Sequence, residues 1–246
     1  MKRVSIIGTV GVPANYGGFE SLVENIIGYN SPADIHYTVY CSAKSYPHRQ
    51  SVYKNADLKY VPLDANGSQS ILYDIVSLIK ATKKSDVILI LGVSGCCFLP
   101  IYRLFLKKRL VINIDGLEHR REKWGKYAKA FLKFSEKMAV KYADAVIADN
   151  KGIQDYVREE YGKEAELIAY GGDHVLCDIA DVEEQILEKY GLKNICYSFS
   201  LCRIEPENNV HVILEAFKAS GKELFFVGNW NRSTYGKYLL EKYAGY

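Results

Sequence analysis

The sequence predicts an α/β fold in which helices cover a mainly parallel, doubly wound sheet. Short apolar runs rich in β-branched residues alternate with longer segments of helical period along the 246 residues. Runs such as VILILGV and LVINID are apolar on both faces, which is typical of strands covered on both sides. Glycine-rich or polar residues directly follow several of these runs. Together these observations predict a doubly wound sheet with ligand-binding loops at its carboxyl edge.

The predicted elements follow one another in alternation. Strands are expected at residues 3–9, 35–42, 58–63, 86–93, 110–115, 145–149, 166–170, 196–202 and 223–228. Helices are expected at residues 19–29, 70–83, 98–107, 124–142, 153–161, 182–190, 210–219 and 235–243. The strands before the Gly-Gly-Asp segment at 171–173 are enough for one complete Rossmann-like sheet, and an acidic amphipathic segment follows it.

Two βα units come after that acidic segment, which is fewer than the ~5 strands of an ordinary open sheet. We therefore expect an N-terminal Rossmann-like domain at residues 1–176. Residues 177–246 are expected to form a linker helix and the beginning of a second, incomplete Rossmann-like domain.

Composition excludes several classes of protein. Apolar residues make up 48% and charged residues 25% of the chain, as in ordinary globular proteins. The net charge of +3 is too small for a dedicated nucleic-acid binder. No apolar run reaches the ~18 residues of a membrane span, and the basic N-terminus leads into too short an apolar stretch for a signal peptide. The cysteines show no CxxC or zinc-ligand spacing, which favours a reducing cytoplasm and no metal site.

The first candidate site is the glycine-rich loop that follows the first strand. Gly17 and Gly18 directly precede a predicted helix, and such a turn lets backbone N–H groups approach a phosphate. The spacing is neither GxGxxG nor GxxxxGK[ST], so neither a dinucleotide fingerprint nor a P-loop is present. Tyr16 and Glu20 beside it are candidates for acceptor contacts. The alternative is that the glycines only permit a positive φ in a tight connection.

A second polar segment follows the fifth strand and contains Asp115, Glu118 and His119. Asp115 and Glu118 can orient a sugar hydroxyl or accept its proton, and Glu118 and His119 are candidates for acceptor contacts. In the alternative interpretation, Asp115 caps a turn and Glu118 pairs with a neighbouring arginine.

The helix at 124–142 places a row of lysines on one face, at Lys126, Lys129, Lys133 and Lys137. The segment from Arg103 to Lys141 carries a net charge of +8. This asymmetry favours contact with anionic lipid headgroups or a pyrophosphate-linked acceptor, and the alternative is a solvated face. The aromatic residues of the same helix are expected to pack on the sheet: Tyr127, Phe131, Phe134 and Tyr142.

A third candidate site follows the strand at 196–202. Arg203 stands at the end of this strand, where a guanidinium can neutralise a leaving diphosphate. The turn of Gly228 and Asn229 follows the next strand and is expected on the same edge. The alternative for Arg203 is an ion pair between domains. No DxD, HExxH or GxSxG motif occurs in the chain.

Four segments, taken in order, resemble one known family. GTVGVPANYGGFESLVENI, IDGLEHRREKW, CRIEPENNVHVILEAF and GNWNRSTYG are similar to glycosyltransferases of family 4, in the rhamnosyltransferase-like branch of bacterial capsule and exopolysaccharide synthesis. The resemblance implies a GT-B fold, with an acceptor-binding N-terminal domain and a nucleotide-sugar-binding C-terminal domain. It also implies metal-independent, retaining transfer, in which the departing diphosphate helps to deprotonate the acceptor.

The resemblance carries over to individual residues. It implies that Gly17 and Gly18 approach the donor phosphates, that Asp115 lies beside the transferring sugar, and that Arg203 is the first cation for the diphosphate. The family's second cation corresponds to Asn208 here. The family's paired glutamates would lie beyond Tyr246, so the chain is expected to be truncated and inactive by itself.

The expected activity is transfer of a sugar, with rhamnose as one candidate, from an NDP-sugar to a lipid-pyrophosphate-linked or polysaccharide acceptor. The donor is a substrate, and no cofactor is expected. The alternative is a non-catalytic acceptor- or membrane-binding fragment of such an enzyme. The expected location is the cytoplasm, with peripheral contact to the anionic inner face of the plasma membrane; an NAD-dependent enzyme is disfavoured because GxGxxG is missing.

Overall fold

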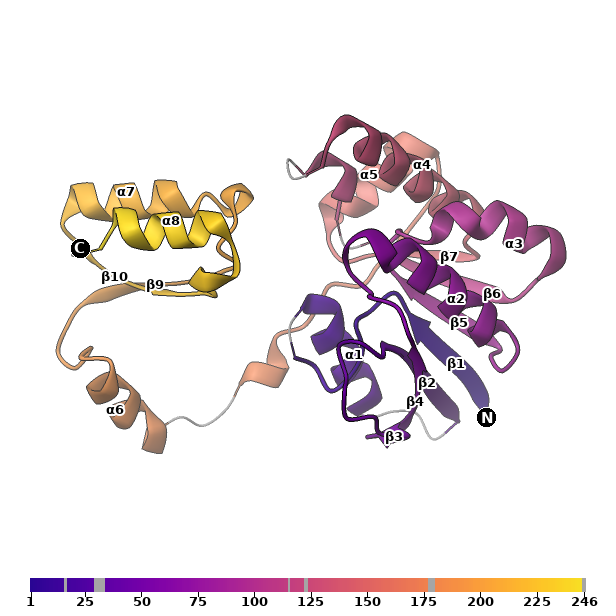
Figure 1. Ribbon diagram of the computed structural model, residues 1–246, viewed down its shortest axis with the longest axis horizontal. Coiled ribbons are helices and arrows are strands. Elements are labelled where there is room, and N and C mark those ends of the chain that lie inside the picture. Colours follow the sequence, from indigo (N-terminus) through magenta and orange to yellow (C-terminus); the bar gives the residue numbers. More distant parts are fainter. Residues whose placement is uncertain (16, 29–33, 115, 122–123, 177–179, 245–246) are drawn as a thin grey trace. The chain divides into compact units, whose positions relative to one another are not determined.

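The computed structural model describes residues 1–15, 17–28, 34–114, 116–121, 124–176 and 180–244. The chain divides into two compact units, Met1–His174 and Val175–Tyr246 (Figure 1). Each unit has its own hydrophobic core and its own parallel strands. The α/β class that the sequence predicts is therefore present in both units.

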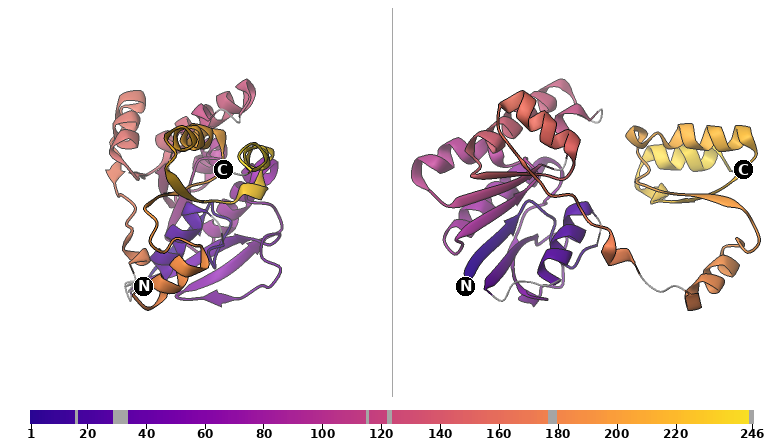
Figure 2. Two further views of the ribbon diagram at one scale, coloured as in Figure 1. Left: turned by 90° about the vertical axis from the view of Figure 1, so that its left-hand side faces the viewer. Right: turned by 180° about the vertical axis from the view of Figure 1, so that it is seen from behind.

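The first unit is built on an eight-stranded sheet in the order β3-β4-β2-β1-β5-β6-β7-β8. Figure 2 shows this sheet from behind, with its strands side by side. Its strands are β1 (Lys2–Ile7), β2 (Ile35–Ser42), β3 (Val52–Tyr53), β4 (Ala56–Val61), β5 (Val87–Leu91), β6 (Arg109–Ile114), β7 (Ala145–Ala148) and β8 (Glu166–Leu167). The two-residue strand β3 pairs antiparallel with β4, and the other pairs are parallel.

The direction in which strands are added reverses at β1. The chain first places β2 and β4 on one side of β1, and then crosses back to add β5, β6, β7 and β8 on the other side. Because such crossovers are right-handed, the reversal moves the connecting helices to the opposite face of the sheet. The helices are α1 (Gly18–Gly28), α2 (Ser70–Thr82), α3 (Leu99–Phe105), α4 (Lys126–Tyr142) and α5 (Lys151–Tyr161).

Two hydrophobic clusters show which helices cover which face. Val23 and Ile27 of α1 are fully buried with Ile6 and Val39 of the sheet. The other cluster joins strand residues such as Ile88 to buried residues of α2, α3, α4 and α5. The sheet is therefore doubly wound, with α1 on one face and the other four helices on the opposite face.

The second unit pairs β9 (Tyr197–Leu201) with β10 (Glu223–Val227) in parallel. Its helices are α6 (Ala180–Lys189), α7 (Val210–Ser220) and α8 (Thr234–Lys242). A small core forms under α7 and α8 from Ile204, Val210, Leu214, Leu239 and Tyr243. The Ser233 hydroxyl caps α8 by accepting a hydrogen bond from the backbone N–H of Gly236 at 3.0 Å.

The prediction for the aromatic face of α4 is wrong at two positions. Tyr127 is 95% exposed and Phe134 is 49% exposed, whereas Ser135 and Glu136 are buried. The two polar residues are buried because each bonds to a neighbouring element, as described below. None of the described helices is long and apolar enough to cross a membrane.

Candidate active site

The loops after β1 and β5 lie at the point where the sheet changes direction. β1 pairs with β2 on one side and with β5 on the other, and all three strands are parallel. In open α/β sheets, ligands bind outside the carboxyl ends of the strands at such a switch point. The glycine loop predicted from the sequence follows β1, so the topology places it at this edge. The loops after β5 and β6 adjoin it in strand order.

Backbone geometry requires glycine at two positions of the first loop. Gly8 has φ +84°, and a Cβ atom there would lie 2.1 Å from the carbonyl oxygen of Leu91. Gly17 has φ +130°, and its Cβ would lie 1.9 Å from Oε2 of Glu20. Gly18, in contrast, has no heavy atom within 4 Å of the position a Cβ would take. Gly17 therefore shapes the loop, whereas Gly18 leaves open space at the start of α1.

Glu20 points back into the loop that precedes it. Its side chain is buried, and Oε1 accepts hydrogen bonds from the Thr9 hydroxyl and the Val10 backbone N–H, both at 2.7 Å. The sequence suggested Glu20 as an acceptor-binding residue. The contacts that the structure shows tie the first turn of α1 to the residues that follow β1.

Glu24, one turn further along α1, fixes the middle of the same loop. Its carboxylate accepts from the Ala14 backbone N–H at 2.5 Å and from the Tyr53 hydroxyl at 2.6 Å. Burial would raise the pKa of Glu24, but these donors and the Lys54 ammonium outweigh it and lower the pKa. Tyr46 donates to the carbonyl oxygen of Pro13 at 2.9 Å. These bonds tie residues 13 and 14 of the loop to α1 and to the segment after β2.

The loop after β5 is held by side chains from α2 and α4. The Gly95 backbone N–H donates to Oδ2 of Asp74 at 3.1 Å, and the Ser135 hydroxyl donates to the Val93 carbonyl at 2.6 Å. Asp74 is 6% exposed. Burial raises the pKa of Asp74 to about 7, although the Gly95 N–H opposes this shift. Sequence analysis missed Asp74, although it is a single carboxylate among apolar residues of a predicted helix.

The polar segment after β6 begins at Asp115, which lies outside the described residues, as does Tyr16. Glu118 accepts from the Arg121 guanidinium at 2.7 Å and from the Trp124 indole N–H at 3.2 Å. This is the ion pair that the alternative interpretation of the sequence gives for Glu118.

His119 turns toward a buried carboxylate on α4. Its Nδ1 lies 3.1 Å from Oε2 of Glu136, which is 1% exposed. The hydroxyls of Tyr156 and Tyr161 on α5 donate to Oε1 of Glu136 at 2.6 and 2.5 Å. Glu136 therefore links the β6 loop to α4 and α5. The sequence does not indicate this role, because a carboxylate that is buried through hydrogen bonds leaves no mark in the hydrophobic pattern of the helix.

The expected row of lysines on α4 is interrupted at Lys133. Its ammonium lies 2.8 Å from Oε1 of Glu160 and hydrogen-bonds the Tyr156 hydroxyl, so it belongs to the network around Glu136. Lys126 and Lys137 are exposed, and Lys129 is half-buried.

Asn113 is a further residue at this edge that sequence analysis missed. It is 3% exposed and stands at the end of β6, where its amide nitrogen donates to the Tyr170 hydroxyl at 2.6 Å. Within the described residues, its Oδ1 is buried and has no hydrogen-bond donor. An unpaired buried acceptor of this kind costs about 1–3 kcal/mol, so it marks a place where a water or ligand donor is favoured.

The second unit carries its candidate residues after both of its strands. The Asn208 side chain donates to the Arg203 carbonyl at 2.7 Å and closes the turn after β9. The Arg203 side chain is exposed, and no described carboxylate pairs with it. A Cβ at Gly228 would lie 2.8 Å from the Cys202 carbonyl, so glycine lets the end of β10 approach this turn. Asn229 follows and is exposed. All four residues lie at the carboxyl edge of this small sheet.

Solved structures show which class of protein has this architecture. Over 99% of the chain, it is similar to sucrose-phosphate synthase from Thermosynechococcus elongatus, with a TM-score of 0.78, 16% identity and 68% of that structure covered. HepE from Anabaena, in complex with UDP and glucose, matches over 99% with a TM-score of 0.69, 14% identity and 66% covered. UDP-N-acetylglucosamine 2-epimerase from Rickettsia bellii matches over 98% with a TM-score of 0.56, 16% identity and 64% covered.

The protein thus has the α/β fold of the GT-B glycosyltransferases, as the resemblance implied. The chain spans about two thirds of the length of these structures. Residues 1–173 match the family described as "Domain of unknown function (DUF1972)", and the chain belongs to that family. A comparison with curated proteins gave no match.

Proposed function

We propose that this protein is a glycosyltransferase of the family 4 type that transfers a sugar from an NDP-sugar to a saccharide acceptor. Rhamnose is the candidate sugar, and a lipid-pyrophosphate-linked or polysaccharide chain is the candidate acceptor, in capsule or exopolysaccharide synthesis. The reaction proposed uses the nucleotide sugar as donor and needs no resident metal or cofactor. The GT-B fold, found over almost the whole chain, is the observation that carries the proposal.

The first unit is proposed to bind the acceptor at its switch point. The loop after β1 is held by Glu20 and Glu24, and the loop after β5 is held by Asp74. Loops fixed in this way lose little conformational freedom when a ligand binds, which favours accurate placement of a hydroxyl group. Asp115 is proposed to orient the acceptor hydroxyl or to stabilise the positive charge on the transferring sugar, with Tyr16 as an acceptor contact.

Glu118 and His119 are proposed to serve the acceptor by positioning rather than by direct contact. Glu118 is bonded to Arg121, and His119 is bonded to the buried Glu136. These two bonds hold the short segment that follows Asp115. Gly17 and Gly18 are proposed to admit a phosphate or acceptor oxygen close to the backbone at the start of α1.

The second unit is proposed to bind the diphosphate of the donor through Arg203. Negative charge grows on the leaving diphosphate as the glycosidic bond breaks, and a guanidinium stays protonated and can bind two oxygens at once. A cation placed where charge develops lowers the barrier more than it stabilises the bound donor. Asn208 would act by fixing the Arg203 backbone, because its amide group already bonds to that carbonyl. Gly228 and Asn229 would line the same edge.

A peripheral position on an anionic membrane is part of the proposal, through Lys126, Lys129 and Lys137. These lysines are exposed or half-buried on α4. Lys133 would contribute less, because its ammonium is already bonded to Glu160 and Tyr156.

The test compares sugar transfer by the wild-type protein, Arg203→Ala and the control Lys237→Ala, each prepared as the full-length gene product, with labelled dTDP-, UDP- and GDP-sugars. Lys237 is exposed on α8 and lies on the same unit, so its replacement removes the same charge. We expect Arg203→Ala to lower kcat by about 100- to 1,000-fold, as for other removed charge-stabilising donors. Equal transfer rates in the two variants would show that Arg203 takes no part in the reaction.

Two other outcomes would contradict the proposed activity. Conversion of a nucleotide sugar to its epimer without any acceptor would identify the protein as an epimerase of the same fold. Binding of saccharides together with complete absence of transfer would favour a non-catalytic acceptor-binding module.

A further inference from the structure

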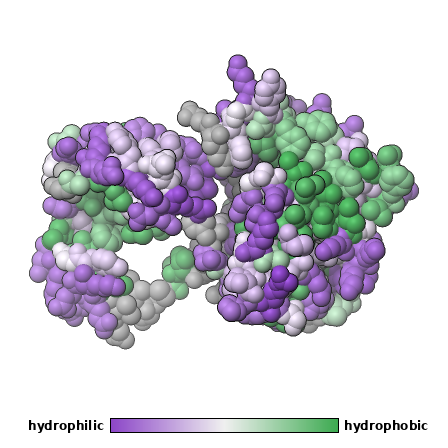
Figure 3. Space-filling view, viewed as in Figure 1, coloured by the Kyte–Doolittle hydropathy of each residue, from purple (hydrophilic) through white to green (hydrophobic). Residues whose placement is uncertain are grey.

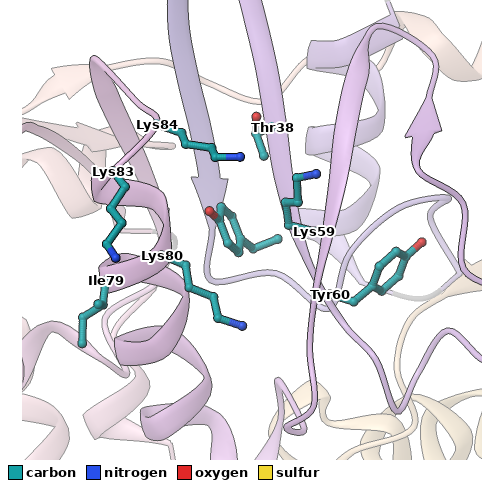
Figure 4. Close-up of a pocket in the computed structure, with 8 residues that line it drawn as sticks. Thr38, Lys59, Tyr60, Ile79, Lys80, Lys83 and Lys84 are labelled. Carbon is teal, nitrogen blue, oxygen red and sulfur yellow. The ribbon is translucent and has the colours of Figure 1, made fainter.

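A pocket lies in the first unit, at the end of α2 that is remote from the switch point. It has a volume of about 320 Å³ (Figure 4). β2 and β4 form one wall, and the last turn of α2 with the residues after it forms the other. The pocket is lined by Thr38, Tyr40, Lys59, Tyr60, Ile79, Lys80, Lys83 and Lys84. Asp74, which holds the β5 loop, precedes Lys83 by nine residues, or roughly 14 Å along the helix.

Four lysines surround the pocket, and no carboxylate lines it. In Figure 4, Lys80 and Lys84 extend from the side of α2 toward the strands that carry Thr38 and Lys59. None of the four ammonium groups forms an ion pair with a carboxylate of the described residues. Unpaired positive charges around a concave surface raise the local concentration of anions.

A purely structural role explains part of this cluster. Lysines in the last turn of a helix interact favourably with its C-terminal carbonyl groups, which accounts for Lys80, Lys83 and Lys84. It does not account for Lys59, which comes from β4 and adds a fourth positive charge.

The side chain of Tyr40 gives an independent indication of a ligand. Tyr40 is 3% exposed and lines the pocket, yet its hydroxyl has no hydrogen-bond partner among the described residues. Burial raises the pKa of Tyr40, so the hydroxyl keeps its proton and can donate it. Apart from Asn113 Oδ1, the described residues contain no buried side-chain oxygen or nitrogen without a partner, so the Tyr40 hydroxyl is accessible from the pocket and can donate to an acceptor oxygen bound there.

We propose that this pocket binds a phosphate group, with Lys59, Lys80 and Lys84 around the anion and Tyr40 as a neutral donor. The volume is at the lower end of the range of small-molecule sites, ~300–1,000 Å³, and suits a phosphate ester or the headgroup of a phospholipid. The site lies apart from the proposed sugar-transfer residues. It would let a phosphorylated compound or membrane lipid bind the first unit without occupying the switch point.

The surface beside the pocket is a reason to test a lipid headgroup as the source of the phosphate. Exposed apolar side chains gather on α2 and α3, and this region is green in Figure 3. They are Leu72, Ile79, Ile101, Leu104 and Phe105, with exposed fractions between 44% and 79%. Residues 98–110 contain four basic and no acidic residues. Apolar side chains beside lysines are typical of contacts with anionic bilayers.

The test uses the full chain with two probes. Inorganic phosphate is titrated calorimetrically, and vesicles of phosphatidylcholine with and without phosphatidylglycerol are used for co-sedimentation. The pocket variants are Lys80→Ala/Lys84→Ala and Tyr40→Phe, and Lys222→Ala/Lys237→Ala is the charge-matched control on the second unit. All measurements are repeated with Arg203→Ala added, so that binding at the proposed donor site does not contribute. Circular dichroism verifies that each variant is folded.

We expect the Lys80→Ala/Lys84→Ala chain to bind at least about tenfold more weakly than the control, because each lost charge-assisted contact typically costs a factor of this size. Tyr40→Phe should weaken binding about fivefold, since one neutral hydrogen bond is lost. If the affinity for dissolved phosphate falls when the lysines are replaced, the ligand is identified as a phosphate ester. If replacing the lysines weakens only the binding to anionic vesicles, the ligand is identified as a lipid headgroup.

The proposal is overturned if neither probe binds, or if the pocket variants bind as tightly as the control. Both results are independent of sugar transfer, because neither measurement includes a nucleotide sugar. A failure of the pocket and a failure of the proposed enzymatic function are therefore distinguishable.

Discussion

Two adjacent glycines at the start of α1 have different roles, although the sequence presents them as a pair. Gly17 has φ +130°, and a Cβ there would collide with Glu20, whereas Gly18 is surrounded by open space. We predict that Gly17→Ala lowers the free energy of unfolding by about 1–3 kcal/mol, through strain at an unfavourable φ, and lowers sugar transfer. Gly18→Ala should change stability by less than about 0.5 kcal/mol. Urea unfolding measures the change in unfolding free energy for each variant. Equal changes would contradict the different roles assigned to Gly17 and Gly18.

Asp74 is a buried carboxyl group whose titration affects folding. Burial raises its pKa to about 7, compared with roughly 4 in an unfolded chain. Between these values the folded state keeps a proton that the unfolded state has lost, so Asp74 makes stability fall as pH rises, by about 1.4 kcal/mol per pH unit. Asp74→Asn should remove this contribution. Denaturant unfolding of both proteins between pH 4 and pH 7 measures the difference between them, and parallel curves would contradict the prediction.

The sequence predicts the location of site residues better than it predicts what their side chains contact. Gly17 follows β1 at the switch point, and Arg203 follows β9, as the apolar runs before them indicate. Glu20 and His119, however, bond to Val10 and Glu136. Such contacts depend on how a helix rotates against its neighbours, which residue types alone do not determine. For the same reason Asp74 and Asn113 were missed, because each is a single polar residue within an apolar segment.

The buried Glu136 joins α4 and α5 to the loop after β6. Tyr161 contributes a hydroxyl that donates to Oε1 of Glu136 at 2.5 Å. We predict that Tyr161→Phe lowers the free energy of unfolding by about 1–3 kcal/mol, because a buried charged acceptor loses a donor. Tyr127→Phe is the control, since Tyr127 is 95% exposed and should tolerate the change. Thermal and urea unfolding test this, and an equally small effect of both changes would mean that Glu136 is satisfied without Tyr161.

Helix and strand positions follow closely from the sequence, with two instructive exceptions. β3 contains two residues, too few for an alternating pattern, and it was not predicted. α4 was predicted at the right place but with the wrong face inward at Tyr127 and Phe134. Its buried face contains Ser135 and Glu136, whose hydrogen bonds to the β5 loop and α5 compensate for burial. Hydrophobic periodicity cannot detect a helix face that is buried through polar contacts.

Each of the two units has a separate hydrophobic core. The clusters of the first unit contain no residue after Ala165, and the cluster of the second unit begins at Ile204. We predict that residues 1–174 fold cooperatively by themselves, because all buried contacts of that core lie within them. Circular dichroism and urea unfolding of this fragment test whether it folds cooperatively. A fragment without a cooperative transition would contradict the independence of the first core.

We propose that the second unit holds a nucleotide sugar through the turn containing Arg203. Saturation-transfer NMR of the chain with dTDP-, UDP- and GDP-sugars tests this claim most directly, because it detects contact without requiring turnover. We expect saturation of the nucleotide protons by the wild type and by Lys237→Ala, and a large loss of this signal with Arg203→Ala. Absence of nucleotide contact with every donor, or an unchanged signal in Arg203→Ala, would contradict it.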